Sequence, residues 1–347
     1  MNVMPDISEL HAIWNRKDNR IIFFLFLCVG MMLATVFYYM VHPVFSSDRM
    51  QLHLQIIEGT APSPYRYRLL IPVIAHGIYW LFRQIPFLSN PQAFDLAYWS
   101  LEALMMSATL IGVYGLLRLW YQRLTALFGA LFAALTIPMT FINQYYQPWS
   151  YAEVLLLILM VFAAKLKSNL AAAIIVLFAS FNRETGFLTV IVYFLINFDL
   201  SEFFAGIRGK KLLVDWKLIG WTAIYALIWL GVFLGLRSWR GSAQAVISIA
   251  DIIQTNFSGF ALWKALLNWL LFYNLFWLWA AKGYRYAAKE VRQLSIILPV
   301  YFVLIGIWAV WIEVRLLMPL FIVILPLGCA YIEKKILPEL AGFSIHE

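Results

Sequence analysis

The first long apolar run constrains this chain most. No side chain from Ile21 to Val41 is charged, and the run is long enough to cross the roughly 30 Å hydrocarbon core of a bilayer as one helix. More apolar runs follow, and 63% of the 347 residues are hydrophobic, against about 45–50% in soluble domains. The pattern predicts an all-α polytopic membrane protein, because helices satisfy their own backbone hydrogen bonds in lipid.

Basic residues set the expected orientation. Arg16, Lys17 and Arg20 directly precede the first span, so the positive-inside rule places the N-terminal segment 1–20 in the cytoplasm. The next apolar run, 69–82, has 14 residues and is short of the roughly 17–25 that a span needs. Treating it as a non-crossing helix keeps most Lys and Arg residues on the cytoplasmic side, so we predict an interfacial or re-entrant helix there.

Ten crossings follow, with both termini in the cytoplasm. The expected spans are 21–41, 94–117, 124–142, 151–165, 169–181, 186–198, 217–236, 260–281, 293–312 and 316–332. The short spans 169–181 and 186–198 are expected to form a helical pair around a break at 182–186. We therefore predict a single transmembrane domain over 1–347 in the plasma (inner) membrane, with a long outer loop at 42–93. The net charge of +8 reflects the cytoplasmic bias, and no nucleic-acid partner is expected.

The polar stretch 46–72 follows the first span on the outer side. Ser46 or Ser47 suits a helix N-cap, with Asp48 in the first turn. Asp48 and Glu58 then share one face of the helix with two glutamines between them. We expect an amphipathic helix along the membrane surface, with this polar face turned toward a cavity.

Prolines shape the chain after this helix. Pro62 and Pro64 favour an extended path, and alternate side chains of an extended chain point the same way. Arg66 and Arg68 are therefore expected to face together.

The outer face is expected to gather arginines. Every basic residue assigned to the outer loops is Arg, whose planar guanidinium binds phosphate oxygens through two donors. The candidate phosphate ligands are Arg66, Arg68, Arg183 and Arg315, and the further candidate site residues are Glu58, Tyr65, Gln144, Glu184 and Glu313. Structural interpretations stay open beside these. Asn182 with Glu184 fits a helix cap, Glu313 with Arg315 fits an ion pair, and the loop arginines fit headgroup anchors.

The stretch that starts at Asp48 resembles a known family. Its residues Asp48, Ile57-Glu58-Gly59, Pro62, Pro64-Tyr65, Tyr67-Arg68 and Pro72 are similar to the first outer loop of the polyprenyl-phosphate-dependent glycosyltransferases of the C superfamily (GT-C). The motif looks most like the branch of membrane mannosyltransferases, and Asn143-Gln144 is similar to a Gly-Gln-x-Asn element of that branch. Leu52 and His53 stand where the branch has paired aromatic residues.

The resemblance implies a GT-C-like transmembrane bundle of about ten helices, whose long first outer loop contains interfacial helices. It also implies that Asp48 is the catalytic base for transfer of a sugar from a polyprenyl-phosphate-linked donor to a lipid, glycan or protein acceptor on the extracytoplasmic face. One carboxylate is enough to take the acceptor proton, and arginines stabilise the leaving phosphate. A single displacement of this kind inverts the anomeric centre. The scheme requires no cofactor and is compatible with a divalent metal.

Two other classes of function remain open. A transporter or flippase for a lipid-linked or anionic substrate would carry inverted repeats and charges near mid-membrane. No repeat is found, and Glu102 and Lys264 are the main charges inside the spans. A lipid-linked glycan polymerase or ligase would share the phosphate recognition but use a pyrophosphate-linked donor.

Overall fold

The computed structural model describes residues 17–144, 148–199, 215–242, 244–245 and 247–339, without the side chains of residues 17, 18 and 142–144. The described elements are α2 (Lys17–Glu58), η1 (Tyr65–Tyr67), α3 (Leu70–Phe82), α4 (Asn90–Arg118), α5 (Arg123–Thr136), η2 (Ile137–Gln144), α6 (Trp149–Lys165), α7 (Asn169–Asn182), η3 (Glu184–Gly186), α8 (Phe187–Asn197), α10 (Trp216–Arg240), α11 (Ile249–Phe257), α12 (Gly259–Tyr273), α13 (Leu275–Gly283), α14 (Lys289–Leu294), α15 (Ile297–Trp308), η4 (Val314–Leu320), α16 (Phe321–Tyr331) and η5 (Ile332–Ile336). Within these residues the fold is all-α, as predicted.

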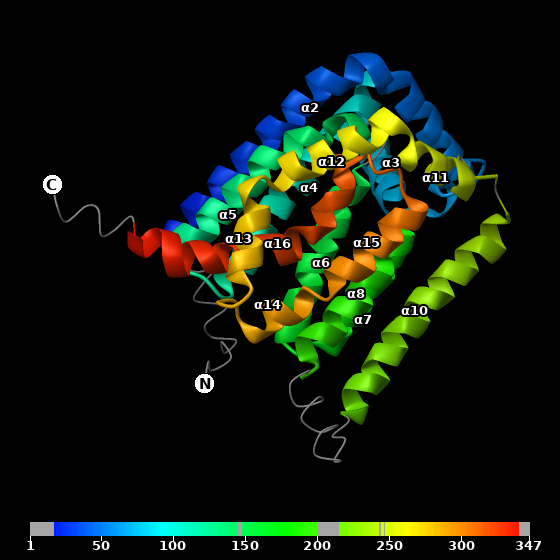
Figure 1. Ribbon diagram of the computed structural model, residues 1–347. Helices are drawn as coiled ribbons and strands as arrows, with labels where there is room; N and C mark the ends of the chain where they lie inside the picture. The colour runs from blue at the N-terminus through cyan, green and yellow to red at the C-terminus, as the bar shows by residue number, and fades with distance from the viewer. Residues whose placement is uncertain (1–16, 145–147, 200–214, 243, 246, 340–347) are drawn as a thin grey trace.

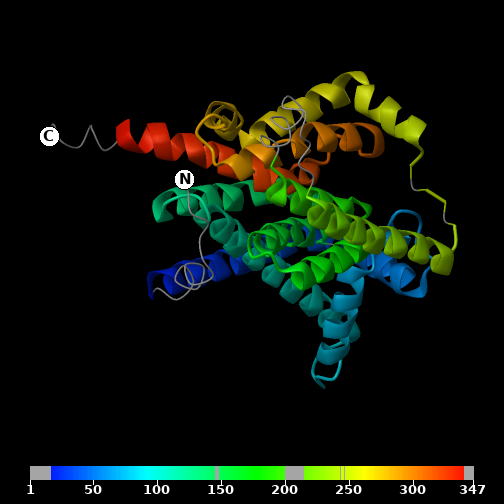
Figure 2. The same cartoon turned by 90° about the horizontal axis from the view of Figure 1, so that it is seen from below.

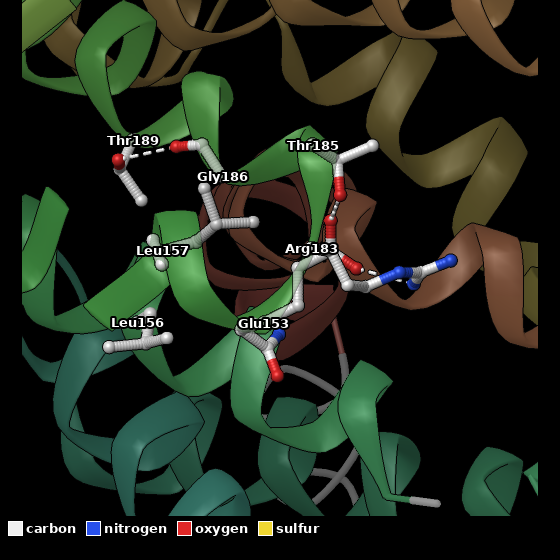
Figure 3. A pocket seen from close by; sticks show the side chains of 9 residues that line it. Glu153, Leu156, Leu157, Arg183, Thr185, Gly186 and Thr189 are labelled. Atoms are coloured by element: carbon white, nitrogen blue, oxygen red, sulfur yellow. Dashed lines mark hydrogen bonds and ion pairs between the residues drawn. The ribbon is translucent and has the colours of Figure 1, made fainter. Parts of the chain in front are cut away.

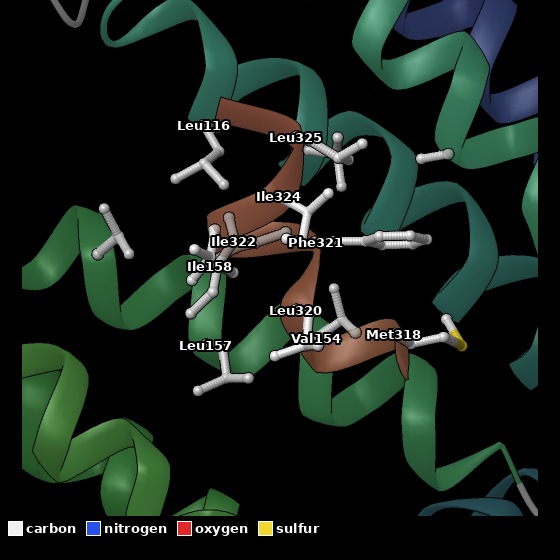
Figure 4. Packing of buried hydrophobic residues seen from close by; sticks show 14 of the residues in the cluster. Leu116, Val154, Leu157, Ile158, Met318, Leu320, Phe321, Ile322, Ile324 and Leu325 are labelled. Carbon is white, nitrogen blue, oxygen red and sulfur yellow. The ribbon is translucent and has the colours of Figure 1, made fainter. Parts of the chain in front are cut away.

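The segment η4–α16 forms the centre of the helix bundle. Every residue from Val314 to Ala330 is buried, as expected for a helix that is apolar on all sides. Figure 4 shows Ile322 and Ile324 among side chains of α4 and α6, including Leu116 and Ile158. The bundle therefore packs around the C-terminal span.

The helix α2 is longer than predicted. It runs for 42 residues, or about 63 Å at 1.5 Å per residue. The predicted boundary between a span at 21–41 and a separate helix from Ser46 is wrong, because one helix passes through both. Figure 1 shows α2, in dark blue, bending at the top of the bundle. Pro43 lies inside the helix, and a proline removes a backbone donor and kinks a helix without necessarily ending it.

The short helix predicted at 69–82 is present as α3. It has 13 residues and is among the apolar helices that are shorter than a candidate span. Figure 2 shows the α3–α4 hairpin, in light blue, projecting from the rest of the bundle. Trp80, Leu81 and Phe87 expose their apolar side chains there. This hairpin is an apolar surface of the kind expected against lipid.

Several predicted spans are divided. The span predicted at 260–281 breaks into α12 and α13 at Asn274, whose φ is 43°. The span at 293–312 becomes α14 and α15, and the loop expected at 237–259 contains α11. The break predicted at 182–186 is confirmed, since the backbone of Arg183 is extended between α7 and α8.

Six helical segments of the described chain are long and apolar enough to cross a membrane. They are Asn19–Glu58, Asn90–Arg118, Arg123–Phe141, Trp216–Arg240, Lys289–Trp308 and Val314–Glu339. The fold is therefore that of an all-α membrane protein, with fewer full-length candidate spans among the described residues than the ten predicted.

Candidate functional site

One end of the bundle gathers arginine and glutamate side chains from separate segments. The segments are the turn before α3, the start of α6, the break between α7 and α8, the last turns of α10, and the start of η4. We call the following seven residues the arginine–glutamate cluster: Arg68, Glu153, Arg183, Glu184, Arg237, Glu313 and Arg315.

Arg183 and Glu153 form the buried floor of the cluster. Arg183 Nη1 lies 2.7 Å from Glu153 Oε2, and the two residues expose only 8% and 4% of their surface. The Thr185 hydroxyl donates to Glu153 Oε1, and Arg183 also donates to the Ser150 hydroxyl at 3.4 Å. Figure 3 shows Glu153, Arg183 and Thr185 converging between helices. A buried pair with these extra hydrogen bonds anchors the break between α7 and α8.

The extended backbone at the break sends neighbouring side chains to different partners. Arg183, with φ −158° and ψ 160°, pairs with Glu153, whereas Glu184 pairs with Arg68. Asn182 ends α7 and donates from Nδ2 to the Trp149 carbonyl at 3.0 Å. The predicted cap formed by Asn182 is therefore wrong, because its amide fastens α7 to the start of α6.

Arg68 is fixed by a carboxylate and two aromatic rings. It donates from Nε and Nη2 to Glu184 Oε2 at 3.2 and 3.1 Å. Its guanidinium carbon lies 5.8 Å from the ring centroid of Tyr65 and 5.4 Å from that of Trp149. The two rings stack on each other with centroids 5.5 Å apart. Cation–π attraction and the carboxylate together set the direction of the guanidinium.

Positive charges crowd around Arg68. Burial lowers the pKa of Arg68, the guanidiniums of Arg183 and Arg315 lower it further, and the Glu184 carboxylate opposes them. Because like charges repel most strongly where water is scarce, these arginines require anionic neighbours.

The rim of the cluster is more open than the floor. Arg237 Nη2 lies 3.7 Å from Glu184 Oε1, and Arg315 Nη2 lies 2.8 Å from Glu313 Oε2. The side chains of Arg237, Glu184 and Glu313 are about a third exposed. Four guanidiniums therefore face three carboxylates, which leaves one positive charge in the cluster.

Some hydrogen-bonding capacity in the cluster is unused. Arg183 Nε and Glu184 Oε1 are buried and have no hydrogen-bond partner among the described residues. A cavity of about 10 Å³ lies against Arg183, Glu153 and Thr185, which is about the room that one water needs. A larger anion would have to approach from the rim.

Arg66 lies outside this cluster. The residues Tyr65–Tyr67 form a 3₁₀ turn instead of the expected extended path, because the Arg68 N–H bonds back to the Tyr65 carbonyl. The side chains of Arg66 and Arg68 therefore contact different partners. Arg66 donates to the Ala61 carbonyl at 2.9 Å and to two carbonyls at the end of α10 at 3.1 and 3.0 Å. It fastens the end of α10 to the loop that precedes α3.

Asp48 and Glu58 lie on the exposed side of α2. Within the described residues, no hydrogen bond or ion pair joins either carboxylate to the arginine–glutamate cluster. The expectation that this polar face turns toward a cavity stays a prediction. The neighbouring Arg49 and His53 are the buried side chains of this part of α2, and they face α4.

Gln144 is the last residue of η2, and its side chain lies outside the described residues, as do residues 145–147. Among the described side chains, no group of three His, Cys, Asp or Glu residues is placed to hold a metal ion.

A second buried polar group joins α2, α3 and α4, and sequence reasoning missed it. Arg49 Nη2 lies 2.7 Å from Glu102 Oε1. His53 Nδ1 lies 2.8 Å from the Tyr98 hydroxyl, and His53 Nε2 lies 3.2 Å from His76 Nδ1. The partners of His53 lie on α3 and α4, far from it along the chain, so spacing in the sequence could not reveal this group.

Glu153 and Arg237 were also missed as site residues. Glu153 lies inside the apolar span predicted at 151–165, and a carboxylate inside a membrane helix is itself a signal of function. Arg237 was among the outer-loop arginines, but only the structure places it on Glu184.

Fold and site together define an all-α membrane protein with a buried cluster of arginine–carboxylate pairs at one end of its bundle. No family model, curated protein or solved structure matches the chain. The likeness to the GT-C enzymes therefore rests on the two sequence motifs alone.

Proposed function

We propose that this protein is a membrane glycosyltransferase that moves a sugar from a polyprenyl-phosphate-linked donor to an acceptor on the extracytoplasmic side. The arginine–glutamate cluster is the observation that carries the proposal. Guanidiniums from four separate segments meet there with one positive charge in excess. A phosphate that leaves with the bonding electrons gains negative charge, and preorganised arginines stabilise that charge.

The proposed reaction is one displacement. The acceptor hydroxyl attacks the anomeric carbon, the bond from that carbon to the phosphate oxygen breaks, and polyprenyl phosphate leaves with the bonding electrons. The hydroxyl proton passes to a carboxylate, and the anomeric centre inverts. Arg237 at the rim, together with the more buried Arg68 and Arg315, would hold the donor phosphate, while Arg183 and Glu153 support them from the floor.

Asp48 is the proposed base. The resemblance assigns it, and one physical argument favours it over Glu184 and Glu313. Both of those glutamates are paired with arginines. Burial opposes the shift, but the Arg68 guanidinium lowers the pKa of Glu184. Asp48 has no arginine partner among the described residues. The acceptor would bind between Asp48 and the cluster.

The test is sugar transfer by the purified full-length protein in nanodiscs, with short-chain polyprenyl-phosphate hexoses and pentoses as donors. Asp48→Asn should lower turnover by about 100-fold or more, the usual contribution of a general base, with little change in donor affinity. Glu58→Gln is the matched control, because Glu58 is also an exposed acid on α2. Near wild-type turnover by Asp48→Asn would remove Asp48 as base and make Glu184→Gln the next variant to measure.

Two outcomes would replace the proposal. Counterflow of a lipid-linked or anionic substrate in sealed vesicles, without sugar transfer, would identify a transporter or flippase. Transfer from pyrophosphate-linked donors only would identify a glycan polymerase or ligase.

A further inference from the structure

One buried amide links the short helix α11 to the segment that leads into the arginine–glutamate cluster. Asn256 is 3% exposed and lies in the last turn of α11. Its Nδ2 donates to the Ala309 carbonyl at 2.8 Å, and its Oδ1 accepts the Trp311 backbone N–H at 2.8 Å. Figure 1 shows α11, in yellow, beside the end of α15, in orange. Both polar atoms of the amide are therefore bound to the loop between α15 and η4.

This loop ends at the cluster. Glu313 follows Trp311 by two residues and directly precedes η4. The Glu313 backbone N–H donates to the Val310 carbonyl at 3.0 Å, so the residues that Asn256 holds form one turn with Glu313. Glu313 Oε2 accepts from Arg315 Nη2 at 2.8 Å and from Arg315 Nε at 3.0 Å. A displacement of the loop would therefore move the Glu313 carboxylate, and the Arg315 guanidinium with it.

The loop needs side-chain partners because its backbone leaves the helical hydrogen-bond pattern. Ala309 is extended, with φ −133° and ψ 151°, and the last carbonyls of a helix have no partner within the helix. An amide can donate from one atom and accept at another, so Asn256 satisfies a carbonyl and an N–H of the loop together. Trp269 Nε1 adds a bond to the Trp311 carbonyl at 2.8 Å. The path of the loop is thus set by side chains of α11 and α12.

We propose that Asn256 is a positioning residue for the pair formed by Glu313 and Arg315. The inference rests on the proposed function, in which Arg315 stabilises the donor phosphate. Asn256 would fix residues 309–311 and so set the direction from which the Arg315 guanidinium meets the phosphate. Stabilisation of a developing charge depends on groups that are already in place, and a small displacement of such a group slows the reaction strongly. Asn256 itself would make no contact with the substrate.

Two substitutions of Asn256 test this role in the full-length protein. Asn256→Asp keeps the size of the side chain and the acceptor for the Trp311 N–H, but it places an oxygen against the Ala309 carbonyl. Asn256→Ala removes both bonds. In the transfer assay with polyprenyl-phosphate sugars, kcat should fall about tenfold in each variant. The donor KM should change less, because the phosphate gains its charge in the transition state.

Asn169→Ala is the matched control. The Asn169 side chain also takes part in two hydrogen bonds, since its Oδ1 accepts the hydroxyl protons of Tyr193 and Tyr225 at 2.9 and 3.3 Å. Asn169 lies at the start of α7, whereas Arg183 follows the end of that helix. We expect a loss of Tm similar to that in Asn256→Ala, with kcat unchanged. Equal falls of kcat in the two alanine variants would show that lost stability explains the effect, and would overturn the proposal.

A double-mutant cycle tests the link to Arg315 without any sugar transfer. The Tm is measured for Asn256→Ala, Arg315→Gln and the variant that carries both substitutions. The double variant should lose clearly less than the sum of the two single losses, because both substitutions disrupt the same ion pair. Additive losses would contradict the positioning role even in a protein that transfers sugar. Non-additive losses in a protein that transfers no sugar would support the link between Asn256 and Arg315 and reject only the proposed function.

Discussion

Arg66 and Arg68 lie two residues apart and hold different parts of the molecule. Arg68 meets the Glu184 carboxylate and two aromatic rings, whereas Arg66 meets backbone carbonyls. The residue type alone does not predict the role of either side chain, because both guanidiniums carry the same set of N–H donors. The partners indicate the role. Arg68, paired with a carboxylate and aromatic rings, is a candidate phosphate ligand, whereas Arg66, bonded to backbone carbonyls, holds two segments together.

Substituting lysine at each position should separate these roles. In Arg68→Lys the charge remains, but the two-donor contact to Glu184 is lost, so turnover should fall about tenfold or more with little change in Tm. In Arg66→Lys the bonds to carbonyls at the end of α10 weaken, which should destabilise the protein by about 1–2 kcal/mol and leave donor affinity unchanged. Turnover, donor KM and Tm are measured for both variants. The same change in both variants would contradict the assignment of separate roles.

The buried pair of Glu153 and Arg183 should dominate stability at this end of the bundle. Glu153→Gln leaves a buried guanidinium without its counter-charge, so we expect a loss of about 3–5 kcal/mol, measured by thermal unfolding in detergent. Glu313→Gln is the control, since Glu313 is 31% exposed and should cost at most about 1 kcal/mol.

A double variant checks the reason for this loss. Removing the charge of Arg183 as well, in Glu153→Gln with Arg183→Gln, should recover part of the stability. A single Glu153→Gln variant as stable as the wild type would show that Arg183 finds another counter-charge.

At the scale of helices, the apolar runs of the sequence predicted which helices exist better than they predicted where each helix begins and ends. The predicted apolar runs became helices because membrane helices are specified by composition over about 20 residues. The ends were set by packing, which the sequence does not display. The serines before Asp48 suit a helix start, yet α2 passes through them because it continues to pack along α4.

The contact between α13 and α16 depends on a glycine. A Cβ at Gly283 would overlap the Leu327 carbonyl oxygen of α16, and a backbone atom cannot rotate away. Gly283→Ala should therefore destabilise the protein by about 1–3 kcal/mol. Gly231→Ala is the control, because nothing lies within 4 Å of its Cβ position in α10. That variant should be neutral or gain up to about 1 kcal/mol. A neutral Gly283→Ala, in the same unfolding assay, would show that the two helices can move apart.

The candidate site was partly foreseeable. Arg68, Arg183, Glu184 and Arg315 were named from loop chemistry, and the structure brings them together. The pairing itself could not be derived, because it depends on how η1, η4 and the α7–α8 break are placed in space. Glu153 escaped notice because its neighbours in the sequence are apolar, although it holds Arg183.

At the scale of the whole molecule, the predicted orientation can be tested by labelling. In a background without Cys28 and Cys329, Ser47→Cys should react with an impermeant maleimide in intact cells, because residue 47 is exposed and is expected outside. Lys335→Cys is equally exposed and should react only after permeabilisation. Labelling of both, or of neither, in intact cells would contradict the predicted topology.

The contact of Glu184 with both Arg68 and Arg237 has a consequence for any ligand that arrives there. The Glu184 carboxylate already neutralises part of the charge of these guanidiniums, so a phosphate does not meet unpaired arginines. The phosphate must displace the Glu184 carboxylate, so one negative charge leaves the guanidiniums as another binds. The affinity for phosphate then depends on how much more strongly the guanidiniums bind phosphate than they bind the Glu184 carboxylate. In the proposed transfer reaction, the Glu184 carboxylate would replace the departing phosphate on these guanidiniums, which would favour its release.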